Sequence, residues 1–207
     1  MANKREPFLQ DSLYHVYNHG NSEDNIFRCD DNFNYFLMKY DAYISPIADT
    51  FAYCLMPNHF HFAMKIKNEA QLTEVFKEKL EAKRDPQGFE NLAGLISRSF
   101  SNFLNAYAKA FNKMHDRRGS LFLDNIQRKE IKEESYFTKL IHYIHYNPVH
   151  HGFVKEIEEW KHSSYHAFLS NKKTKLNREN VLEWFGGKND FEKFHQWKPE
   201  MDFELHF

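Results

Sequence analysis

The sequence predicts an α+β protein in which helices pack on an antiparallel sheet and a helical extension follows at the C-terminus. Two periodicities indicate this class: some segments alternate apolar and polar residues, as half-buried strands do, and others repeat apolar residues every three or four positions, as amphipathic helices do. The order of the segments is a third observation. With two neighbouring helices counted as one position, they run β-α-β-β-α-β, and a further helix follows.

The first half of the chain supplies three strands and one helix. In the helix, Phe33, Phe36 and Tyr40 recur at helical spacing and form a face that can be buried. The dipeptide Pro57-Asn58 is a turn signal between the last two strands. The predicted elements are, in order, a strand over residues 12–19, a helix over 32–44, and strands over 50–55 and 59–67.

The second half supplies one more strand and three helices. The last helix is expected to stop at Asn147-Pro148, because the residue before a proline is disfavoured in the α conformation. The segment 83–89 is rich in turn-forming residues and is expected to be a mobile loop. The predicted elements are helices over 71–83 and 92–113, a strand over 125–131, and a helix over 133–146. This is the element order of a ferredoxin-like fold, in which helices cover one face of the sheet.

The pair His59 and His61 opens an alternating strand. Side chains two apart in a strand point to the same side, so the two imidazoles share one face while Phe60, Phe62 and Met64 occupy the other. Neutral imidazoles placed in this way can share a metal ion. The alternative is a solvated sheet face, and a metal would also need a third ligand from another part of the chain.

A polar stripe on the last predicted helix offers that ligand. Lys139, Tyr143 and Asn147 are spaced i, i+4 and i+8, so their side chains stand one above another if the final turn reaches Asn147. If the Asn147 oxygen completes a metal site, the Tyr143 phenol one turn away is in a suitable place to act as a nucleophile on a phosphodiester. The alternative is an ordinary half-buried tyrosine followed by an asparagine that ends a helix.

Five short motifs occur in a fixed order along residues 12–168. Together they resemble the single-tyrosine transposases of the His-hydrophobic-His (HUH) nuclease superfamily, in particular those associated with repetitive extragenic palindromes (REP). The motifs are Tyr14-His15-Val16-Tyr17-Asn18, Asn25-Ile26-Phe27, Met56-Pro57-Asn58-His59-Phe60-His61, Gly119-Ser120-Leu121-Phe122, and Tyr143-Ile144-His145-Tyr146-Asn147-Pro148-Val149 followed by Gly152.

The resemblance implies roles for the residues already singled out. His59, His61 and Asn147 are expected to bind a divalent metal, Mg²⁺ or Mn²⁺, and Tyr143 is expected to be the nucleophile. From its spacing, Lys139 is a candidate to stabilise the phenolate. Many members of the family carry arginine where His19 and His150 stand, and a polar residue where Leu123 stands, so the DNA contacts follow less directly from the resemblance.

The implied function is a metal-dependent single-strand DNA endonuclease and transposase. It would cleave and rejoin single-stranded hairpin DNA through a 5′-phosphotyrosine intermediate. Two alternatives remain open: a domesticated single-stranded DNA-binding protein that does not cleave, and a metal-dependent hydrolase that uses water in place of Tyr143. Neither the DNA target nor the choice between monomer and homodimer follows from the sequence.

The charge distribution bears on the DNA partner. The chain as a whole has a formal net charge of −1, which lacks the basic excess that many nucleic-acid-binding proteins have. Residues 97–132, however, carry eight basic and three acidic side chains. Arg117, Arg118 and Arg128 of this stretch are the predicted contacts to the DNA backbone. The alternative is a solvated helix surface.

Composition and the C-terminal part complete the predictions. With two cysteines and no apolar run long enough for a membrane span, a cytoplasmic protein without a membrane role is expected. We predict a transposase domain over residues 1–168 and an extension over 169–207. The extension contains two predicted short helices, about residues 181–185 and 190–195. Its aromatic residues favour packing on the body: Trp184, Trp197, Phe203 and Phe207.

Overall fold

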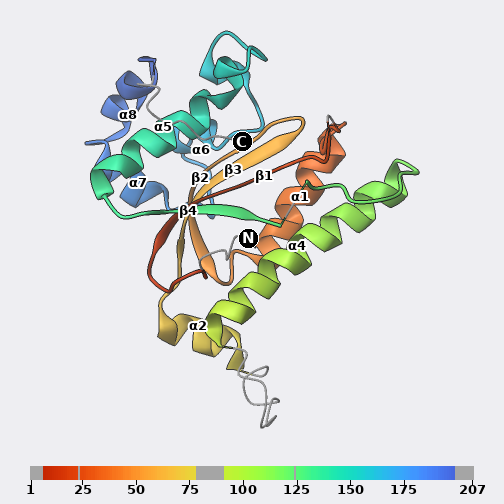
Figure 1. Ribbon diagram of the computed structural model, residues 1–207. Helices are drawn as coiled ribbons and strands as arrows, with labels where there is room; N and C mark the ends of the chain where they lie inside the picture. The colour runs from red at the N-terminus through yellow and green to blue at the C-terminus, as the bar shows by residue number, and fades with distance from the viewer. Residues whose placement is uncertain (1–6, 23, 78–90, 124, 199–207) are drawn as a thin grey trace, which may run out of the picture.

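The computed structural model describes residues 7–22, 24–77, 91–123 and 125–198 of the chain. Four strands form one antiparallel sheet in the spatial order β2-β3-β1-β4. The connections from β1 to β2 and from β3 to β4 are crossovers, because the strands that they join are not neighbours in the sheet (Figure 1). This is the ferredoxin-like arrangement, and the predicted fold class is confirmed. The strands are β1 (Leu13–His19), β2 (Ala48–Leu55), β3 (His59–Ile66) and β4 (Gln127–Ile131).

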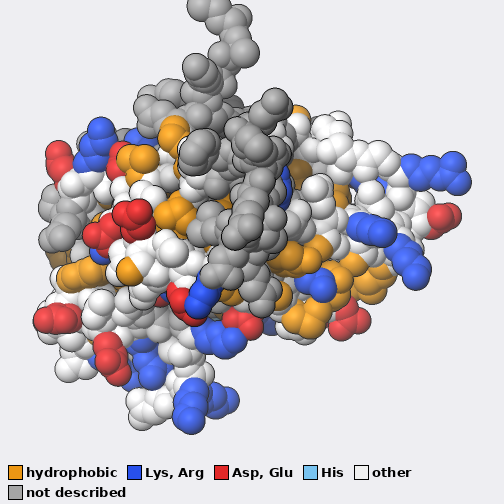
Figure 2. All heavy atoms as spheres, turned by 90° about the horizontal axis from the view of Figure 1, so that it is seen from below, with side chains coloured by type: hydrophobic (Ala, Val, Ile, Leu, Met, Phe, Trp, Pro, Cys, Tyr) orange, Lys and Arg blue, Asp and Glu red, His pale blue; other side chains and the backbone are white. Residues whose placement is uncertain are grey.

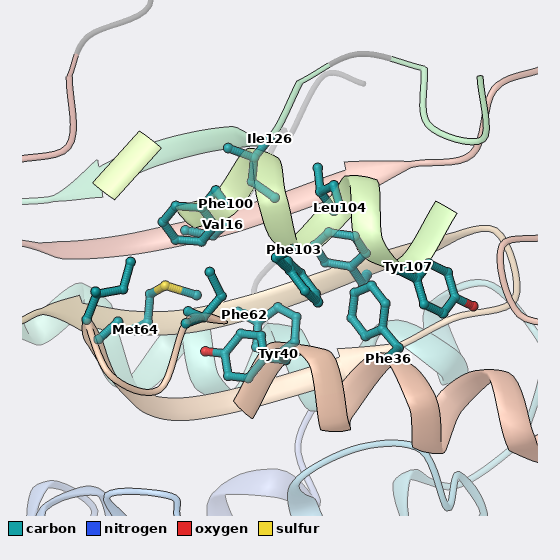
Figure 3. Close-up of a cluster of buried hydrophobic side chains, with 14 of the residues drawn as sticks. Val16, Phe36, Tyr40, Phe62, Met64, Phe100, Phe103, Leu104, Tyr107 and Ile126 are labelled. Carbon is teal, nitrogen blue, oxygen red and sulfur yellow. The ribbon is translucent and has the colours of Figure 1, made fainter. Parts of the chain in front are cut away.

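The first face of the sheet is covered by α1 (Asp30–Tyr43) and α4 (Leu92–Met114), with α2 (Glu69–Val75) beside the latter (Figure 1). Aromatic side chains fill the space between these helices and the sheet. Phe36 of α1 meets Phe103 of α4 and Phe60 of β3, with ring centroids about 5 Å apart. Figure 3 shows how this cluster interlocks. Each of these rings removes a large apolar area from water, so this face is the main core of the protein.

The second face is also covered, so the expectation that helices occupy one face only was wrong. Helix α5 (Glu134–His150) crosses β2 and β3 there, on the opposite side of the sheet from α1 and α4 (Figure 1). The physical reason is that small residues on this face let a helix approach closely. Ala52 and Ala63 lie beneath α5 and are fully buried with Ile141 of the helix. The histidine side of β3 therefore faces protein instead of water.

Helix α5 continues through Pro148 and does not stop at Asn147, which corrects the predicted end. The missing N–H of a proline removes one hydrogen bond, but the turns on both sides hold the chain helical. The helix ends at His150 and is capped two residues later by Gly152, whose φ of 71° is in the left-handed region. The N–H groups of Phe153 and Gly152 donate to the carbonyls of Pro148 and Val149, which is a Schellman motif. Asn147 therefore keeps the helical phase of Tyr143.

The C-terminal extension packs on the second face. It comprises α7 (Arg178–Trp184) and α8 (Lys188–His195), which follow the short elements η1 (Ile157–Glu159) and α6 (Tyr165–Leu169). Phe191 of α8 is fully buried, and the Trp184 ring stacks at 5.1 Å on Phe51 of β2. Trp197, in contrast, is 74% exposed. Phe203, Phe207, the 83–89 loop and the end of the predicted 71–83 helix lie outside the described residues.

Helix α2 ends at Val75, with Phe76 as its C-cap, so the predicted extension of this helix to residue 83 was wrong. The remaining boundaries agree with the periodicity to within about three residues. Helix α2 begins at Glu69, two positions before its predicted start, because Asn68 and Gln71 form a reciprocal capping box. In the described parts of the chain, no helix combines the length and apolar character that crossing a membrane requires.

Candidate functional site

The candidate site lies between the second face of the sheet and helix α5. His59 and His61 come from β3, and Tyr143 and Asn147 come from successive turns of α5. His59 Nε2 lies 3.0 Å from Asn147 Oδ1, across 88 positions of sequence. The rings of His61 and Tyr143 meet edge to face with centroids 5.9 Å apart. The structure thus brings together four of the residues that the sequence singled out.

The four side chains are almost completely enclosed. Tyr143 is 6% exposed and the other three are 3% exposed or less. Burial lowers the pKa of His59 to about 4 and that of His61 well below its usual value, so both imidazoles are neutral at pH 7. Burial also raises the pKa of the Tyr143 phenol, and the Asn147 side chain opposes that shift only in part. Lys139 lies one turn before Tyr143 on α5 and is exposed.

The hydrogen bonds of His59 leave two acceptor atoms, His59 Nε2 and Asn147 Oδ1, facing each other. His59 Nδ1 lies 2.8 Å from Asn58 Oδ1, a carbonyl oxygen that can only accept, so Nδ1 carries the ring proton. In the neutral ring Nε2 then has a lone pair, and this lone pair points at Asn147 Oδ1, a second acceptor. Asn147 Nδ2 is buried and has no hydrogen-bond partner in the described structure. Two changes would relieve this arrangement: a rotation of the Asn147 carboxamide that turns Nδ2 toward His59 Nε2, or a cation between the two acceptors.

The donor atoms of these residues fit a divalent metal. An imidazole nitrogen and a carboxamide oxygen are both ligands that such ions accept, and His59 Nε2 and Asn147 Oδ1 lie 3.0 Å apart. Among the residues that the structure describes, no group of three or more His, Cys, Asp or Glu side chains could hold a metal ion. A cation at this place would therefore depend on the Asn147 carboxamide together with the two histidines.

His15 is a site residue that the sequence argument missed. It lies on β1, is 1% exposed, and places its Nε2 3.0 Å from His61 Nδ1. When His61 Nδ1 donates this hydrogen bond, His61 Nε2 is left without a proton, as a metal ligand must be. The signal was present: His15, Tyr17 and His19 alternate along β1, and pairing with β3 sets His19 opposite His59.

Tyr17 is a second phenol close to the histidine pair. Its ring centroid is 6.1 Å from that of His61, which is similar to the separation of Tyr143 and His61. Burial raises the pKa of Tyr17, as it does for Tyr143. The two tyrosines differ in origin, since Tyr17 is held within the sheet and Tyr143 belongs to a helix that lies on it.

The three predicted DNA-binding arginines occupy different environments. The Arg117 guanidinium pairs with Asp24 and donates to the carbonyl of Ser120, so it holds the loop that follows α4. Arg118 is exposed beside it. Arg128 lies 4.3 Å from the ring centroid of Phe8, on the face of the sheet that carries α1 and α4. On the surface shown in Figure 2, basic and acidic side chains are interspersed.

A second group of histidines joins α5 to the extension. His195 Nδ1 donates to the Phe191 carbonyl at 2.8 Å, so its Nε2 accepts a hydrogen bond from His145 Nδ1 at 2.9 Å. The Ser164 hydroxyl then donates to His145 Nε2 at 2.7 Å and accepts the backbone N–H of Tyr53 at 2.8 Å. The nitrogen atoms of His145 and His195 and the Ser164 hydroxyl in this hydrogen-bond series each have a partner. The series links α5, α8 and β2.

His142 of α5 also belongs to this buried group, because its ring centroid lies 4.9 Å from that of His195. The group predicts a loss of stability in mild acid. Burial lowers the pKa of His195 to about 3 and that of His142 to about 4, from an unfolded value near 6.5. Their contribution is complete above pH 6.5 and is lost as the pH falls toward 3, because the unfolded chain takes up protons first. At pH 5 these two groups should contribute about 4 kcal/mol to the fall in the free energy of unfolding. The buried His59 and His61 add to this fall for the same reason.

Urea unfolding at pH 7.5 and pH 5.0, followed by tryptophan fluorescence, measures this difference. Equal free energies of unfolding at the two pH values would contradict the neutral, buried state of His142 and His195.

The fold and the site together define a class: a ferredoxin-like protein in which a tyrosine helix covers a histidine pair on the sheet. No family model matches the chain. The chain is 24% identical over 123 residues to a curated Haemophilus influenzae protein, which is named there as a candidate REP-associated tyrosine transposase. The match covers 57% of this chain and 59% of that protein, so the chain spans less than two thirds of the relative's length.

A solved structure shares the fold. It is the structure of a REP-associated tyrosine transposase bound to a REP hairpin, with a TM-score of 0.54, 14% identity, and coverage of 83% of this chain and 87% of that one. At this level of identity the likeness concerns the fold. The two comparisons confirm the resemblance to REP-associated tyrosine transposases that the ordered motifs predicted.

Proposed function

We propose that this chain is a metal-dependent single-strand DNA endonuclease and transposase that cleaves and rejoins hairpin DNA through Tyr143. The observation that carries the proposal is the meeting of Tyr143 with His59, His61 and Asn147 between α5 and the sheet. The similarity to proteins named as REP-associated tyrosine transposases supports a REP-like hairpin as the DNA partner.

In the proposed reaction the Tyr143 hydroxyl oxygen attacks the phosphorus of the scissile phosphodiester. The phenol releases its proton to solvent, a bond forms between phosphorus and the phenolic oxygen, and the bond to the 3′ oxygen breaks. The 3′ oxygen takes up a proton and leaves as a 3′-hydroxyl. His59, His61 and Asn147 would hold a divalent ion, which when bound polarises the phosphate and favours the phenolate. Attack by another 3′-hydroxyl on the phosphotyrosine reverses the step and rejoins DNA.

The closed site requires a movement when DNA binds. Tyr143, His59, His61 and Asn147 are each at most 6% exposed, so a phosphodiester reaches them only if the Tyr143 side chain or α5 moves away from the sheet. Lys139 and Arg118 are exposed and remain candidates to stabilise the phenolate and to contact the DNA backbone, respectively. Arg117 and Arg128 would have to exchange their present partners for phosphates.

The test is an adduct assay with hairpin DNA and Mn²⁺, in which one sample is labelled at the 5′ end and another at the 3′ end. The proposal expects the 3′ label to move with the protein on a denaturing gel, and the 5′ label to move as a shorter free strand. Mass spectrometry of the adduct should place the DNA on Tyr143. Bound, intact DNA would instead indicate a non-cleaving binder, and cleavage without an adduct would indicate a hydrolase that uses water.

A further inference from the structure

We infer that His19 and Asn58 are positioning residues that select the metal-binding tautomer of His59. The inference rests on the proposed function, because it assigns His19 and Asn58 to the proposed metal site. The observation is a continuous path of hydrogen bonds from the Gly20 carbonyl through His19 and Asn58 to His59, in which each donor determines the next.

The path begins at a fixed carbonyl. His19 Nδ1 lies 2.8 Å from the Gly20 oxygen, which can only accept, so Nδ1 carries the proton of the neutral ring. The position of this carbonyl is well determined: the Gly20 N–H donates to the Asn58 carbonyl at 2.7 Å, and a Cβ at Gly20 would lie 2.3 Å from the Asp24 oxygen. A glycine is therefore required where β1 leaves the sheet.

His19 in turn orients the Asn58 carboxamide. With its proton on Nδ1, the neutral His19 ring has a lone pair on Nε2, which lies 3.1 Å from Asn58 Nδ2. The amide nitrogen must face this lone pair, so Oδ1 faces His59 Nδ1 at 2.8 Å. The reversed amide would oppose two acceptors at His19 and two donors at His59. The rings of His19 and His59 also stack, 5.6 Å apart and 9° from parallel.

The consequence is a choice between two states of His59. Without an acceptor at Nδ1, the ring would place its proton on Nε2 and donate it to Asn147 Oδ1, a satisfied hydrogen bond that excludes a cation. With Asn58 Oδ1 in place, the proton stays on Nδ1 and the Nε2 lone pair is available. The path therefore favours the tautomer with its proton on Nδ1, which can bind a metal, over the tautomer with its proton on Nε2, which donates to Asn147 Oδ1.

Two substitutions at Asn58 separate positioning from packing. Asn58→Ala removes the acceptor, and Asn58→Asp keeps an acceptor for His59 while removing the donor to His19. We expect Asn58→Ala and His19→Ala each to weaken Mn²⁺ binding, measured by calorimetry without DNA, by about 10-fold or more. Asn58→Asp should bind Mn²⁺ at least as well as the parent. Both oxygens of a carboxylate are acceptors, so either one can accept the proton of His59 Nδ1.

The double variant is the sharpest test. In the Asn58→Asp background, His19→Ala should have at most a small further effect on Mn²⁺ affinity, since no amide remains to be oriented and only the stacking of the His19 ring on His59 is lost. A loss equal to that of the single His19→Ala variant would overturn the inference. The exposed His166, replaced by Ala, serves as the control that leaves Mn²⁺ affinity unchanged.

The tautomer can also be observed without metal or DNA. Nitrogen-15 spectra of the imidazoles should show His59 protonated at Nδ1 in the parent and at Nε2 in Asn58→Ala. An unchanged tautomer in that variant would overturn the inference and leave the proposed function intact. If His59 changes tautomer as expected but hairpin DNA gives no adduct with the parent, the proposed function fails and the positioning remains.

Discussion

Replacement of Tyr143 by phenylalanine should abolish the covalent adduct with hairpin DNA. The change removes one oxygen, and it is the oxygen that forms the bond to phosphorus in the proposed reaction. Without the nucleophile we expect the rate of strand cleavage to fall by about 1,000-fold or more. The ring itself is retained, and its edge-to-face contact with His61 does not involve the hydroxyl. Folding and hairpin binding should therefore be preserved.

Single-turnover cleavage of 3′-labelled hairpin, together with a gel-shift measurement of binding, checks both parts of this expectation. Tyr146→Phe is the matched control, because Tyr146 lies on the same helix and packs against His142 instead of the histidine pair. This control should cleave like the parent protein. If Tyr143→Phe still forms an adduct and the adduct maps to Tyr17, the role of nucleophile belongs to the sheet tyrosine.

Replacement of His145 by alanine should produce the largest loss of stability among these variants. His145 is fully buried and joins Ser164 to His195, so its removal leaves a cavity and leaves His195 Nε2 without its partner, while the Ser164 hydroxyl can still donate to the Tyr53 carbonyl. The cavity costs about 2–4 kcal/mol, and the unsatisfied group adds about 1–3 kcal/mol. We expect the free energy of unfolding to fall by about 3 kcal/mol or more.

Urea unfolding at pH 7.5 measures this loss. The exposed His166 provides the control, and His166→Ala should change the free energy of unfolding by less than about 1 kcal/mol. A loss of less than about 1 kcal/mol for His145→Ala would mean that the extension is not held to α5 by this path. In that case residues 169–207 would behave as a separate attachment to the body.

The elements that the sequence predicted well are those whose local pattern and tertiary role agree. Phe36, Phe60 and Phe103 stand at apolar positions of their helices or strand, and all three meet in the core. The end of α5 shows the opposite case. Pro148 is a local stop signal, but the left-handed residue that a Schellman motif needs is Gly152, and the helix continues through Pro148 to His150. A local rule was overridden by the packing of the helix on the sheet.

The candidate site divides in the same way. The identity of His59, His61, Tyr143 and Asn147 came from alternation, helical spacing and the ordered motifs, and the structure groups them. Their burial did not follow from the sequence, because a histidine face on a strand is equally compatible with water. The roles of these residues in metal binding and catalysis stay predictions, as does the cytoplasmic location.

What the sequence by itself determined is the set of local patterns: which segments are strands or helices, and which side chains share a face, because backbone geometry dictates both. Only the tertiary structure decided which faces meet. It placed α5 over the histidines, made His15 a partner of His61, and ran a hydrogen-bond path from Gly20 to His59. Such contacts join residues far apart in the chain, and side-chain packing decides them, so no local pattern contains them.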